Sequence, residues 1–470
     1  MCGVVGIHAP GNEAASLAAL GLFALQHRGQ ESAGVAVSDG HGIMVYKDLG
    51  LVDQVIDERR LQSLRGGLAI AHCRYSTTGS TIWENSQPAF RLGPRRSVAI
   101  GHNGNLVNTQ ALLDELPGGR SRLVGTTDTE LLTALLASEP GTDLVEALLS
   151  LLPRVSGAYS LVVMDETRVV GVRDPYGFRP LVLGVLPNAD GEAWCLASET
   201  AALDVLGAEY VRDVEPGELV VLGEPGGPRS VRFAEGREQL CVFELIYFAR
   251  PDSYMLGRNL YEVRRRMGEV LAREAPVDAD LVMPVPETGA PAAAGYAEAS
   301  GIPYREGMTR NRYAGRTFIQ PSNGLRQRGV TVKLSALREQ VRDRRLIVVD
   351  DSIVRGTTTR QIVGLLRRAG AKEVHVRISA PPIFHPCFYG IDTQIETELI
   401  AGQKSVDEIR EFIGADSLAY LSIGGVLEGI DIPRDRFCFA CFDGNYPVPV
   451  PYDAGNRKFL LERDQLAVVG

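Results

Sequence analysis

The segment at residues 346–359 constrains the fold and the chemistry of this chain more than any other. Four apolar residues, 346–349, run directly into Asp350 and Asp351, and small and hydroxyl-bearing residues follow at 355–359. Consecutive aliphatic residues, most of them β-branched, favour a buried strand of a parallel sheet. The residues after the strand can direct several backbone N–H groups at an anion from the start of a helix. The sequence therefore predicts a strand that ends in a phosphate-binding turn beside two carboxylates.

A strand, a turn and an acidic helix cap would explain part of this pattern without any ligand. The full set suits a ribose phosphate better, because its hydroxyls and its phosphate need carboxylates and phosphate donors side by side. The run resembles the phosphoribosyltransferase signature. The resemblance implies that Asp350 and Asp351 bind the ribose hydroxyls and Mg2+ of phosphoribosyl pyrophosphate. It assigns the phosphate-binding turn to Ser352, Arg355, Gly356, Thr357, Thr358 and Thr359.

A second junction between a strand and a turn lies at residues 281–289, and a helical pattern follows at 290–300. In the phosphoribosyltransferases that the chain resembles, this turn often places a hydroxyl near Mg2+, which assigns Thr288 to the metal together with the acidic pair. Capping of the following helix by Thr288 is the alternative. Another short apolar run at 374–378 adds a strand to the series. Strands that alternate with helices in this way predict an open parallel sheet.

Composition and charge narrow the class of protein. The chain has 470 residues, of which 45% are hydrophobic and 23% charged, so it can build substantial cores, and we expect two large domains. Its net charge of -9 argues against a non-specific nucleic-acid partner. Residues 1–10 lack the pattern of a signal peptide, and no apolar run reaches the roughly 18 residues of a membrane span. We therefore expect a cytoplasmic protein with no membrane or nucleic-acid partner.

The chain contains seven cysteines, an odd number that argues against a disulfide framework. Removal of Met1, which the small second side chain favours, would make Cys2 the first residue. Its free amine could then act as the base for its own thiol, as in N-terminal nucleophile catalysis. A cysteine at position 2 is more often incidental, so its role depends on the motifs that accompany it. We expect Cys73 and Cys195 to be buried without a role in the chemistry.

Three later motifs accompany Cys2, namely QHRGQES at 26–32, HCRYSTTG at 72–79 and GHNGN at 101–105. With Cys2 they resemble the glutamine amidotransferases that use an N-terminal cysteine. The resemblance implies that Asn103 and the backbone N–H of Gly104 form the oxyanion hole. It assigns the binding of glutamine to Arg74, Tyr75, Thr77 and Asp128.

Asp128 lies in the run GTTDTE and would accept the α-amino group of glutamine in that family. Helix capping is the commoner role of such a residue and of the threonines beside it. His102 fits a buried structural histidine and is assigned no chemistry. Short apolar runs between Gly and Pro turns predict strands through this half, with a covering helix at 145–152 that starts near Asp143. The resemblance implies a four-layer αββα sandwich over residues 1–230.

The boundary between the halves is expected at 224–239, where turn-forming residues coincide with a loss of apolar periodicity. A surface hairpin is the alternative interpretation. Residues 231–470 would then form a type I phosphoribosyltransferase domain, and the overall fold class is α/β and α+β. Residues 305–338 carry many arginines and several glycines. A solvated loop is the ordinary explanation of such a segment, but beside a phosphoribosyl motif we expect a mobile flap that closes over pyrophosphate.

Cys438 and Cys441 form a C-x-x-C pair, which by itself fits a redox pair, a zinc site or chance. Cys241 and Cys387 bring the number of available thiolates to four. Four thiolates are enough for a 4Fe-4S cluster or for tetrahedral zinc. Their dispersed spacing leaves buried free cysteines as the default for the two distant residues.

The glutaminase motifs, the run VVDDSIVRGTTT and two further runs at 310–319 and 436–447 together resemble the iron-sulfur amidophosphoribosyltransferases over nearly the whole chain. The resemblance implies 5-phosphoribosylamine synthesis from glutamine and phosphoribosyl pyrophosphate, the first step of purine synthesis. It implies Mg2+ and a 4Fe-4S cluster held by the four cysteines, purine nucleotide inhibitors and a homotetramer. Another cysteine glutaminase, such as a glucosamine-phosphate synthase, and a phosphoribosyl-pyrophosphate-sensing regulatory protein are the alternatives.

Overall fold

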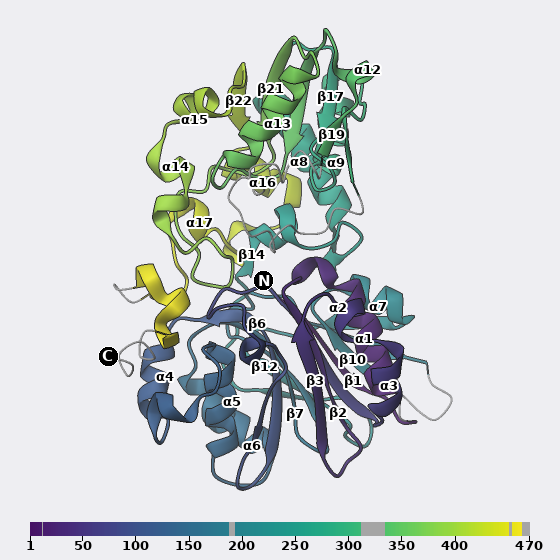
Figure 1. Cartoon of the computed structure of the whole chain (residues 1–470), viewed down its shortest axis with the longest axis vertical. Helices are drawn as coiled ribbons and strands as arrows, with labels where there is room; N and C mark the ends of the chain where they lie inside the picture. The colour runs from purple at the N-terminus through teal and green to yellow at the C-terminus, as the bar shows by residue number, and fades with distance from the viewer. Residues whose placement is uncertain (12, 188–192, 312–333, 451–453, 463–470) are drawn as a thin grey trace.

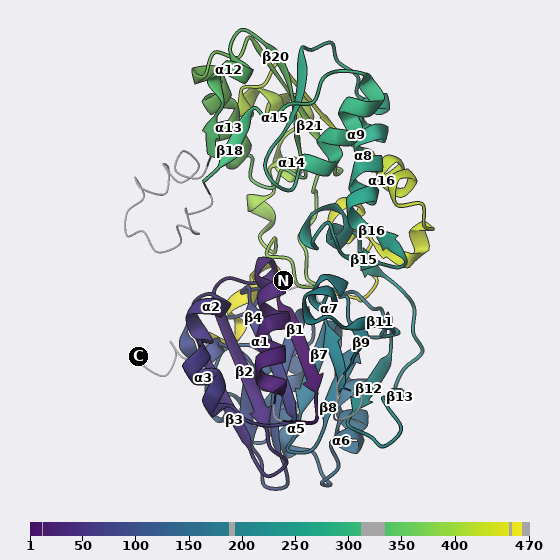
Figure 2. The same cartoon turned by 90° about the vertical axis from the view of Figure 1, so that its right-hand side faces the viewer.

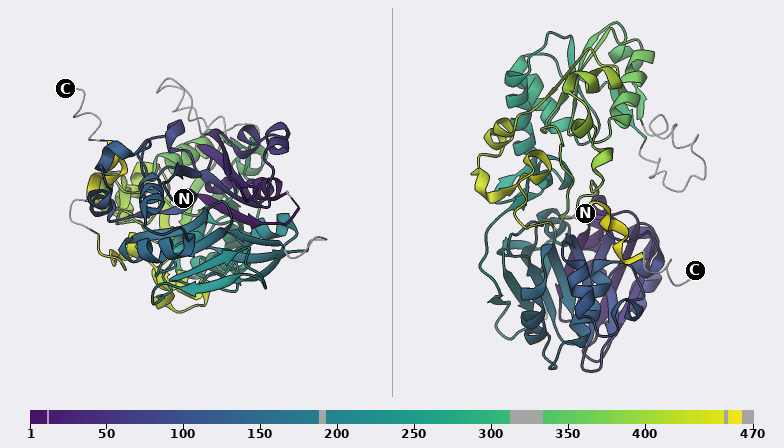
Figure 3. Two further views of the ribbon diagram at one scale, coloured as in Figure 1. Left: turned by 90° about the horizontal axis from the view of Figure 1, so that it is seen from below. Right: turned by 90° about the vertical axis from the view of Figure 1, so that its left-hand side faces the viewer.

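The computed structural model describes residues 1–11, 13–187, 193–311, 334–450 and 454–462. The chain forms two lobes, with its first half in one and most of its second half in the other (Figure 1). The N-terminus lies between the lobes. The last described segment returns to the first lobe, which Figure 3 shows from a further side. None of the described helices combines the length and apolarity that crossing a membrane requires.

Two antiparallel sheets form the centre of the first lobe. The seven-stranded sheet has the order β11-β9-β10-β1-β4-β2-β3, and the six-stranded sheet has the order β13-β12-β8-β7-β6-β5. The first contains β1 (Gly3–His8), β2 (Ser32–Ser38), β3 (Ile43–Leu49), β4 (Leu68–Arg74), β9 (Val182–Leu186), β10 (Ala193–Ala197) and β11 (Glu209–Asp213). The second contains β5 (Ala89–Leu92), β6 (Ser97–Leu106), β7 (Gly157–Met164), β8 (Val169–Arg173), β12 (Glu218–Leu222) and β13 (Arg229–Arg232).

Helices cover the outer face of each sheet. Those beside the seven-stranded sheet are α1 (Ala14–Ala24), α2 (Val52–Val55), α3 (Glu58–Ser63) and α7 (Thr200–Leu206). Those beside the six-stranded sheet are α4 (Thr109–Glu115), α5 (Asp128–Ser138) and α6 (Leu144–Leu151). One buried apolar cluster fills the space between the sheets, and one lies under each layer of helices. The predicted αββα sandwich is thus confirmed.

Local sequence signals explain several boundaries. The predicted helix at 145–152 is α6, and Asp143 caps it by accepting the N–H of Val145 at 2.9 Å. The helix α1 ends at Ala24, and a tight turn, η1 (Gln26–Arg28), follows it. This turn leaves the side chain of Arg28 fully buried.

The turn-forming residues at 224–228 do not lie between the lobes. They connect β12 to β13, which pair with Val220 opposite Ser230. The hairpin interpretation is therefore the correct one for this part of the segment. The last strand of the six-stranded sheet ends at Arg232, and the core of the second lobe begins at Leu240.

A four-stranded parallel sheet of order β17-β20-β21-β22 forms the centre of the second lobe, as expected from the sequence. Its strands are β17 (Leu281–Pro284), β20 (Arg345–Asp350), β21 (Glu373–Ile378) and β22 (Ser417–Tyr420). The helices of this lobe are α8 (Leu260–Glu274), α9 (Ala290–Ser300), α12 (Arg338–Val341), α13 (Thr357–Arg368), α14 (Ile400–Gln403), α15 (Val406–Ile413), α16 (Ile423–Ile430) and α17 (Ala440–Asp443). Figure 2 shows this lobe above the sandwich.

Short strand pairs complete the second lobe. They are β14 (Leu240–Cys241) with β23 (Phe437–Cys438), β15 (Tyr254–Met255) with β16 (Arg258–Asn259), and β18 (Met308–Arg310) with β19 (Leu334–Ala336). The first pair is parallel and places Cys241 opposite Cys438. A π-helical turn, η5 (Glu244–Phe248), follows β14 and faces the first lobe. The segment η8 (Ala454–Glu462) packs on the first lobe, where Leu461 joins the core beside α4 to α6.

Candidate functional site

Cys2, the predicted nucleophile of the first lobe, immediately precedes β1 and is buried. Its N–H donates to Asn103 Oδ1 at 3.1 Å, and its carbonyl accepts from Arg28 Nε at 2.9 Å. Its Sγ lies 3.4 Å from the backbone nitrogen of Tyr75 and 3.5 Å from the carbonyl oxygen of the same residue. Burial raises the pKa of the Cys2 thiol, so its ionisation needs a base close by.

The predicted oxyanion hole lies on β6, directly beside Cys2. Asn103 is fully buried, and its Nδ2 has no hydrogen-bond partner among the described residues. An unpaired buried donor is costly, but next to a nucleophile it suits a negative charge that develops during reaction. Gly104 has a φ of 154°, and a Cβ at this position would lie 2.0 Å from Ala158 O. Only glycine therefore fits here.

Three of the predicted glutamine-binding residues gather at the end of β4. Arg74 is the last residue of the strand and is 2% exposed. Its guanidinium donates to the carbonyls of Thr78 at 2.8 Å and Ser80 at 3.2 Å, so it shapes the loop that follows. Thr77 is buried in this loop, and Tyr75 lines the cavity described below. The structure thus brings these residues together beside Cys2.

Asp128 is the first residue of α5, but it is not the cap. The cap is Thr127, whose hydroxyl accepts a backbone N–H of the first turn at 3.1 Å. Asp128 Oδ2 instead accepts the N–H of Leu106 at 3.0 Å, which ties the start of α5 to the end of the oxyanion strand. His102 Nδ1 lies 3.1 Å from the hydroxyl of Thr129, as suits a buried structural histidine.

The predicted metal-binding residues lie together in the second lobe. Asp350 ends β20, and Asp351 accepts hydrogen bonds from Thr288 Oγ1 at 2.5 Å and Ser352 Oγ at 2.6 Å. Thr288 does not cap α9, whose cap position is Gly289. Burial raises the pKa of both aspartates, and Asp351 raises that of Asp350 further. Two buried carboxylates and a hydroxyl form a donor set that suits a hard cation.

The predicted phosphate-binding turn leads into α13. Gly356 occupies the cap position with a φ of 72°, and a Cβ there would meet Ile400 Cδ1 at 2.9 Å. Residues 357–359 form the first turn of the helix, so their N–H groups have no partner within it and can bind an anion. The side chain of Arg355 is 57% exposed and pairs with Glu398. The backbone of the turn, more than the Arg355 side chain, therefore offers donors for an anion.

One cavity of about 1150 Å3 reaches from Tyr75, the one predicted glutamine-binding residue that lines it, to the predicted phosphoribosyl-binding residues of the second lobe. From the first lobe it is lined by Gln26 and Tyr75, and from the second by Thr288, the acidic pair and residues 355–359. Arg310, at the end of β18, also lines it. Residues 312–333, most of the predicted flap, lie outside the described part of the chain.

The four cysteines of the predicted cluster come together at one end of the second lobe. All are buried and none forms a disulfide. Cys241 and Cys438 face each other in the β14–β23 pair, and Cys441 follows in α17. Burial raises the pKa of the Cys441 thiol, and the other three thiols, including that of Cys387, raise it further. Among the described residues, no group of three or more Cys, His, Asp or Glu side chains is arranged so that it could hold a metal ion.

Comparison with known proteins identifies the family. Models of a glutamine amidotransferase domain and a phosphoribosyl transferase domain match residues 72–205 and 257–382. The amidophosphoribosyltransferase of Mycobacterium tuberculosis is 52% identical over 473 residues, covering 98% of this chain and 89% of that protein. The Bacillus subtilis amidophosphoribosyltransferase is 47% identical, covering 96% of this chain and 95% of its own. The chain belongs to the amidophosphoribosyltransferase family.

Solved structures agree with this amidophosphoribosyltransferase assignment. Glutamine phosphoribosylpyrophosphate amidotransferase from B. subtilis, complexed with ADP and GMP, is 45% identical with a TM-score of 0.88, covering 96% of this chain and 98% of that one. The allosteric regulatory enzyme of purine biosynthesis is 46% identical with a TM-score of 0.90, covering 98% and 99%. Membership of the amidophosphoribosyltransferase family and the two-part fold are confirmed.

The sequence motifs did not reveal every residue that builds the amidophosphoribosyltransferase site. Four buried charged residues lie beside Cys2 and were not assigned a role, namely Arg28, Arg179, Glu199 and Glu244. The sequence carries a signal for two of them. Arg28 lies inside the motif QHRGQES, and Glu244 is the first charged residue in the apolar run CVFELIYF.

A loop of the second lobe, residues 387–394, also contacts the predicted glutaminase residues, and the sequence analysis did not predict this contact. Asn105 Nδ2 donates to the carbonyl of Phe388 at 3.0 Å, and Gln394 Nε2 donates to the carbonyl of Thr77 at 2.9 Å. The loop therefore contacts both the oxyanion strand and the glutamine loop.

Proposed function

We propose that this amidophosphoribosyltransferase makes 5-phosphoribosylamine, glutamate and pyrophosphate from glutamine, phosphoribosyl pyrophosphate and water, the first step of purine synthesis. The single observation that carries the proposal is the shared cavity. It reaches from Tyr75, beside the Cys2 thiol, to the acidic pair and phosphate turn after β20. Residues 1–230 would supply ammonia and residues 231–470 would use it.

The first reaction would begin at Cys2 after removal of Met1. With Met1 in place, burial lowers the pKa of its amine to about 5. The amine that Cys2 gains when Met1 is removed would take the thiol proton as Sγ attacks the glutamine amide. Asn103 Nδ2 and the N–H of Gly104 would stabilise the oxyanion. The proton then passes to the leaving ammonia, and water releases glutamate.

Glutamine would be held by the buried residues around this thiol. Arg74 offers a cation for the α-carboxylate, and Asp128 offers a carboxylate for the α-amine. Tyr75 and Thr77 complete the set from the loop after β4.

In the second reaction ammonia would attack C1 of the ribose while pyrophosphate leaves, through a state with oxocarbenium character. Asp350 and Asp351 would orient the ribose hydroxyls, and the N–H groups of the turn at 356–359 would hold the 5-phosphate. The acidic pair and Thr288 suit Mg2+, which would neutralise charge on the leaving pyrophosphate.

The paired nitrogen-donor assay tests the proposal. Cys2→Ala should abolish product formation from glutamine and leave product formation from ammonium intact, because only the first lobe loses its nucleophile. Cys195→Ala, in the buried strand β10 of the same lobe, should retain both activities. Loss of both activities in a folded Cys2→Ala protein would contradict the two-site mechanism. Absence of turnover in the wild-type protein would favour a sensor of phosphoribosyl pyrophosphate.

The proposal includes a 4Fe-4S cluster held by Cys241, Cys387, Cys438 and Cys441. Four buried, unbridged thiols whose charges influence one another fit this group chemically. The cluster would cross-link β14, β23, α17 and the loop at 387–394. Anaerobically purified protein should contain about four iron and four sulfide per chain. Stoichiometric zinc without sulfide would contradict the assignment.

Three further properties belong to the proposal. The B. subtilis relative was solved with ADP and GMP, and we expect purine nucleotides to inhibit this chain, which an inhibition assay tests. We expect a homotetramer, which light scattering measures directly. The seven unbridged cysteines suit a reducing, cytoplasmic location, which cell fractionation would check.

A further inference from the structure

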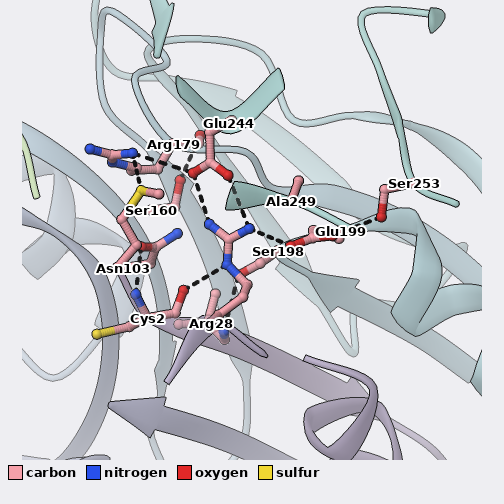
Figure 4. A network of polar contacts seen from close by, with 12 residues as sticks. Cys2, Arg28, Asn103, Ser160, Arg179, Ser198, Glu199, Glu244, Ala249 and Ser253 are labelled. Atoms are coloured by element: carbon pink, nitrogen blue, oxygen red, sulfur yellow. Dashed lines mark hydrogen bonds and ion pairs between the residues drawn. The ribbon is translucent and has the colours of Figure 1, made fainter. Parts of the chain in front are cut away.

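A buried network of ion pairs lies at the junction of the two lobes, beside Cys2 (Figure 4). Its members are two arginines and two glutamates, each at most 1% exposed: Arg28, Arg179, Glu199 and Glu244. Buried charges are costly unless they are paired and hydrogen-bonded. Apolar side chains of similar volume often stabilise a core as well as such a network does. Stability alone therefore does not account for it.

Arg28 connects this network to the nucleophile. Its Nε donates to the carbonyl of Cys2 at 2.9 Å, while the N–H of Cys2 donates to Asn103 Oδ1 at 3.1 Å. Both backbone groups of Cys2 are thus held by side chains, one from η1 and one from β6. A displacement of about 1 Å at a reacting group can lower a rate about a hundredfold. The orientation of Arg28 therefore bears on the attack by the thiol.

Glu244 sets that orientation from the second lobe. Its Oε1 accepts from Arg28 Nη2 at 2.8 Å, and its Oε2 accepts from Arg28 Nη1 at 3.1 Å. Such a two-point contact fixes the plane of a guanidinium group. Oε1 also accepts from Arg179 Nη1 at 3.3 Å. The residues that follow Glu244, Leu245 and Ile246, belong to the core of the second lobe.

Glu199 cannot replace Glu244 in this role. It reaches Arg28 only through Nη1, and its Oε2 accepts from the N–H of Arg250 at 2.9 Å and from the hydroxyl of Ser253 at 2.7 Å. A one-point contact defines the plane of a guanidinium group less firmly than a two-point contact does. The Glu244 carboxylate, in contrast, has the two arginines as its only side-chain partners in the described part of the chain.

Arg264 holds the backbone that carries Glu244. Its Nε donates to the carbonyl of Leu245 at 2.8 Å, and its Nη2 donates to that of Ala249 at 2.7 Å, one at each end of the π-helical turn η5. A π-helical turn inside a chain often marks a functional position. Arg264 is 3% exposed and also lines the cavity that contains the acidic pair. The position of Glu244 is therefore fixed within the second lobe.

We propose that Glu244 is a positioning residue for glutamine hydrolysis. Through it the second lobe holds Arg28, and through Arg28 the backbone of Cys2, in the orientation that attack on the amide requires. The inference rests on the proposed function. It means that the glutaminase site is incomplete without the second lobe, although the residues predicted to bind glutamine all come from the first.

The test is Glu244→Gln, which keeps the size of the side chain and removes its charge. We expect the glutamine-dependent kcat to fall about 10- to 100-fold, with the KM for glutamine within about twofold of wild type because Arg74 and Asp128 are untouched. Turnover with ammonium should not change. Inactivation of Cys2 by a diazoketone analogue of glutamine should slow by the same factor as kcat. Glu244→Asp, which retains a carboxylate, should recover part of the loss.

Glu238→Gln is the matched control. Glu238 precedes β14 and pairs with Arg173 at 2.9 Å and with Arg436 at 3.6 Å. Its substitution removes ion pairs that make no contact with Arg28 or Cys2. It should leave both activities unchanged.

Three results would overturn the inference: an unchanged glutamine-dependent kcat in Glu244→Gln, an equal loss of both activities, or an equal effect of Glu238→Gln. Should Glu244→Gln fail to fold, Glu244→Asp becomes the test, and wild-type kcat with glutamine would then reject the role. Failure of the wild-type protein to use glutamine would instead refute the proposed function, so the two failures are distinguishable.

Discussion

At the scale of single residues, the predicted oxyanion hole contains a donor that has no partner among the described residues. Asn103 is fully buried, and Oδ1 accepts the N–H of Cys2, yet Nδ2 has no partner among the described residues. Such an atom destabilises the folded state. We expect it to gain a partner when the amide oxygen of glutamine becomes an oxyanion, an interaction that would favour the transition state over the ground state.

Substitution of Asn103 by alanine should therefore lower the glutamine-dependent kcat by about 10²- to 10³-fold. The KM for glutamine should change little, because the donor acts mainly after the attack has begun. Steady-state kinetics with glutamine checks this, and turnover with ammonium serves as the internal control. An increase in KM without a loss in kcat would show that Asn103 binds the substrate instead of the oxyanion.

At the scale of helices and strands, elements with local signals could be predicted. The apolar run before Asp350 forms β20, and the helix predicted at 290–300 ends where Gly301 adopts the left-handed conformation. The strand β22 has no such signal, because its four residues are half-buried on both faces and lack periodicity. Its place depends on pairing with β21, which is distant in sequence.

Residues whose partners are remote could not be assigned for the same reason. The motif around Arg28 indicated glutaminase chemistry, but its partner Glu244 lies 216 positions later in an apolar run. Nothing in that run specifies an arginine partner. The packing of η8 on the first lobe likewise depends on contacts between residues that are distant in sequence. Glu462 binds Ser80, and Leu461 joins the core beside α5.

The segment η8 should support the binding of glutamine. Glu462 Oε1 accepts from the N–H of Ser80 at 2.7 Å and from Thr126 Oγ1 at 3.1 Å, so it braces the loop whose carbonyls hold Arg74. Glu462→Gln should raise the KM for glutamine several-fold and leave turnover with ammonium unchanged. Glu428→Gln, which removes a surface pair with Arg273, is the control. Equal KM values in wild type and Glu462→Gln would show that Glu462 does not support the binding of glutamine.

At the scale of the whole molecule, the lobes are joined by polar contacts in which each lobe supplies a buried carboxylate to the other. Glu244 of the second lobe binds arginines of the first, and Glu199 of the first accepts hydrogen bonds from Arg250 and Ser253 of the second. The cavity lies at the same junction. Because these contacts fix the lobes around the cavity, we expect ammonia to pass from one site to the other without release to solvent.

Isotope competition tests this passage. With ¹⁵N-amide glutamine and an excess of unlabelled ammonium, the wild-type product should carry mostly ¹⁵N. Ala249 is buried at the cavity wall, and Ala249→Leu should narrow the cavity beside η5. Glutamate release should then continue, while product per glutamate falls below one and unlabelled nitrogen enters the product. Ala249→Ser, of nearly unchanged size, should behave as wild type. A ratio of one in Ala249→Leu would show that ammonia takes a route that does not pass Ala249.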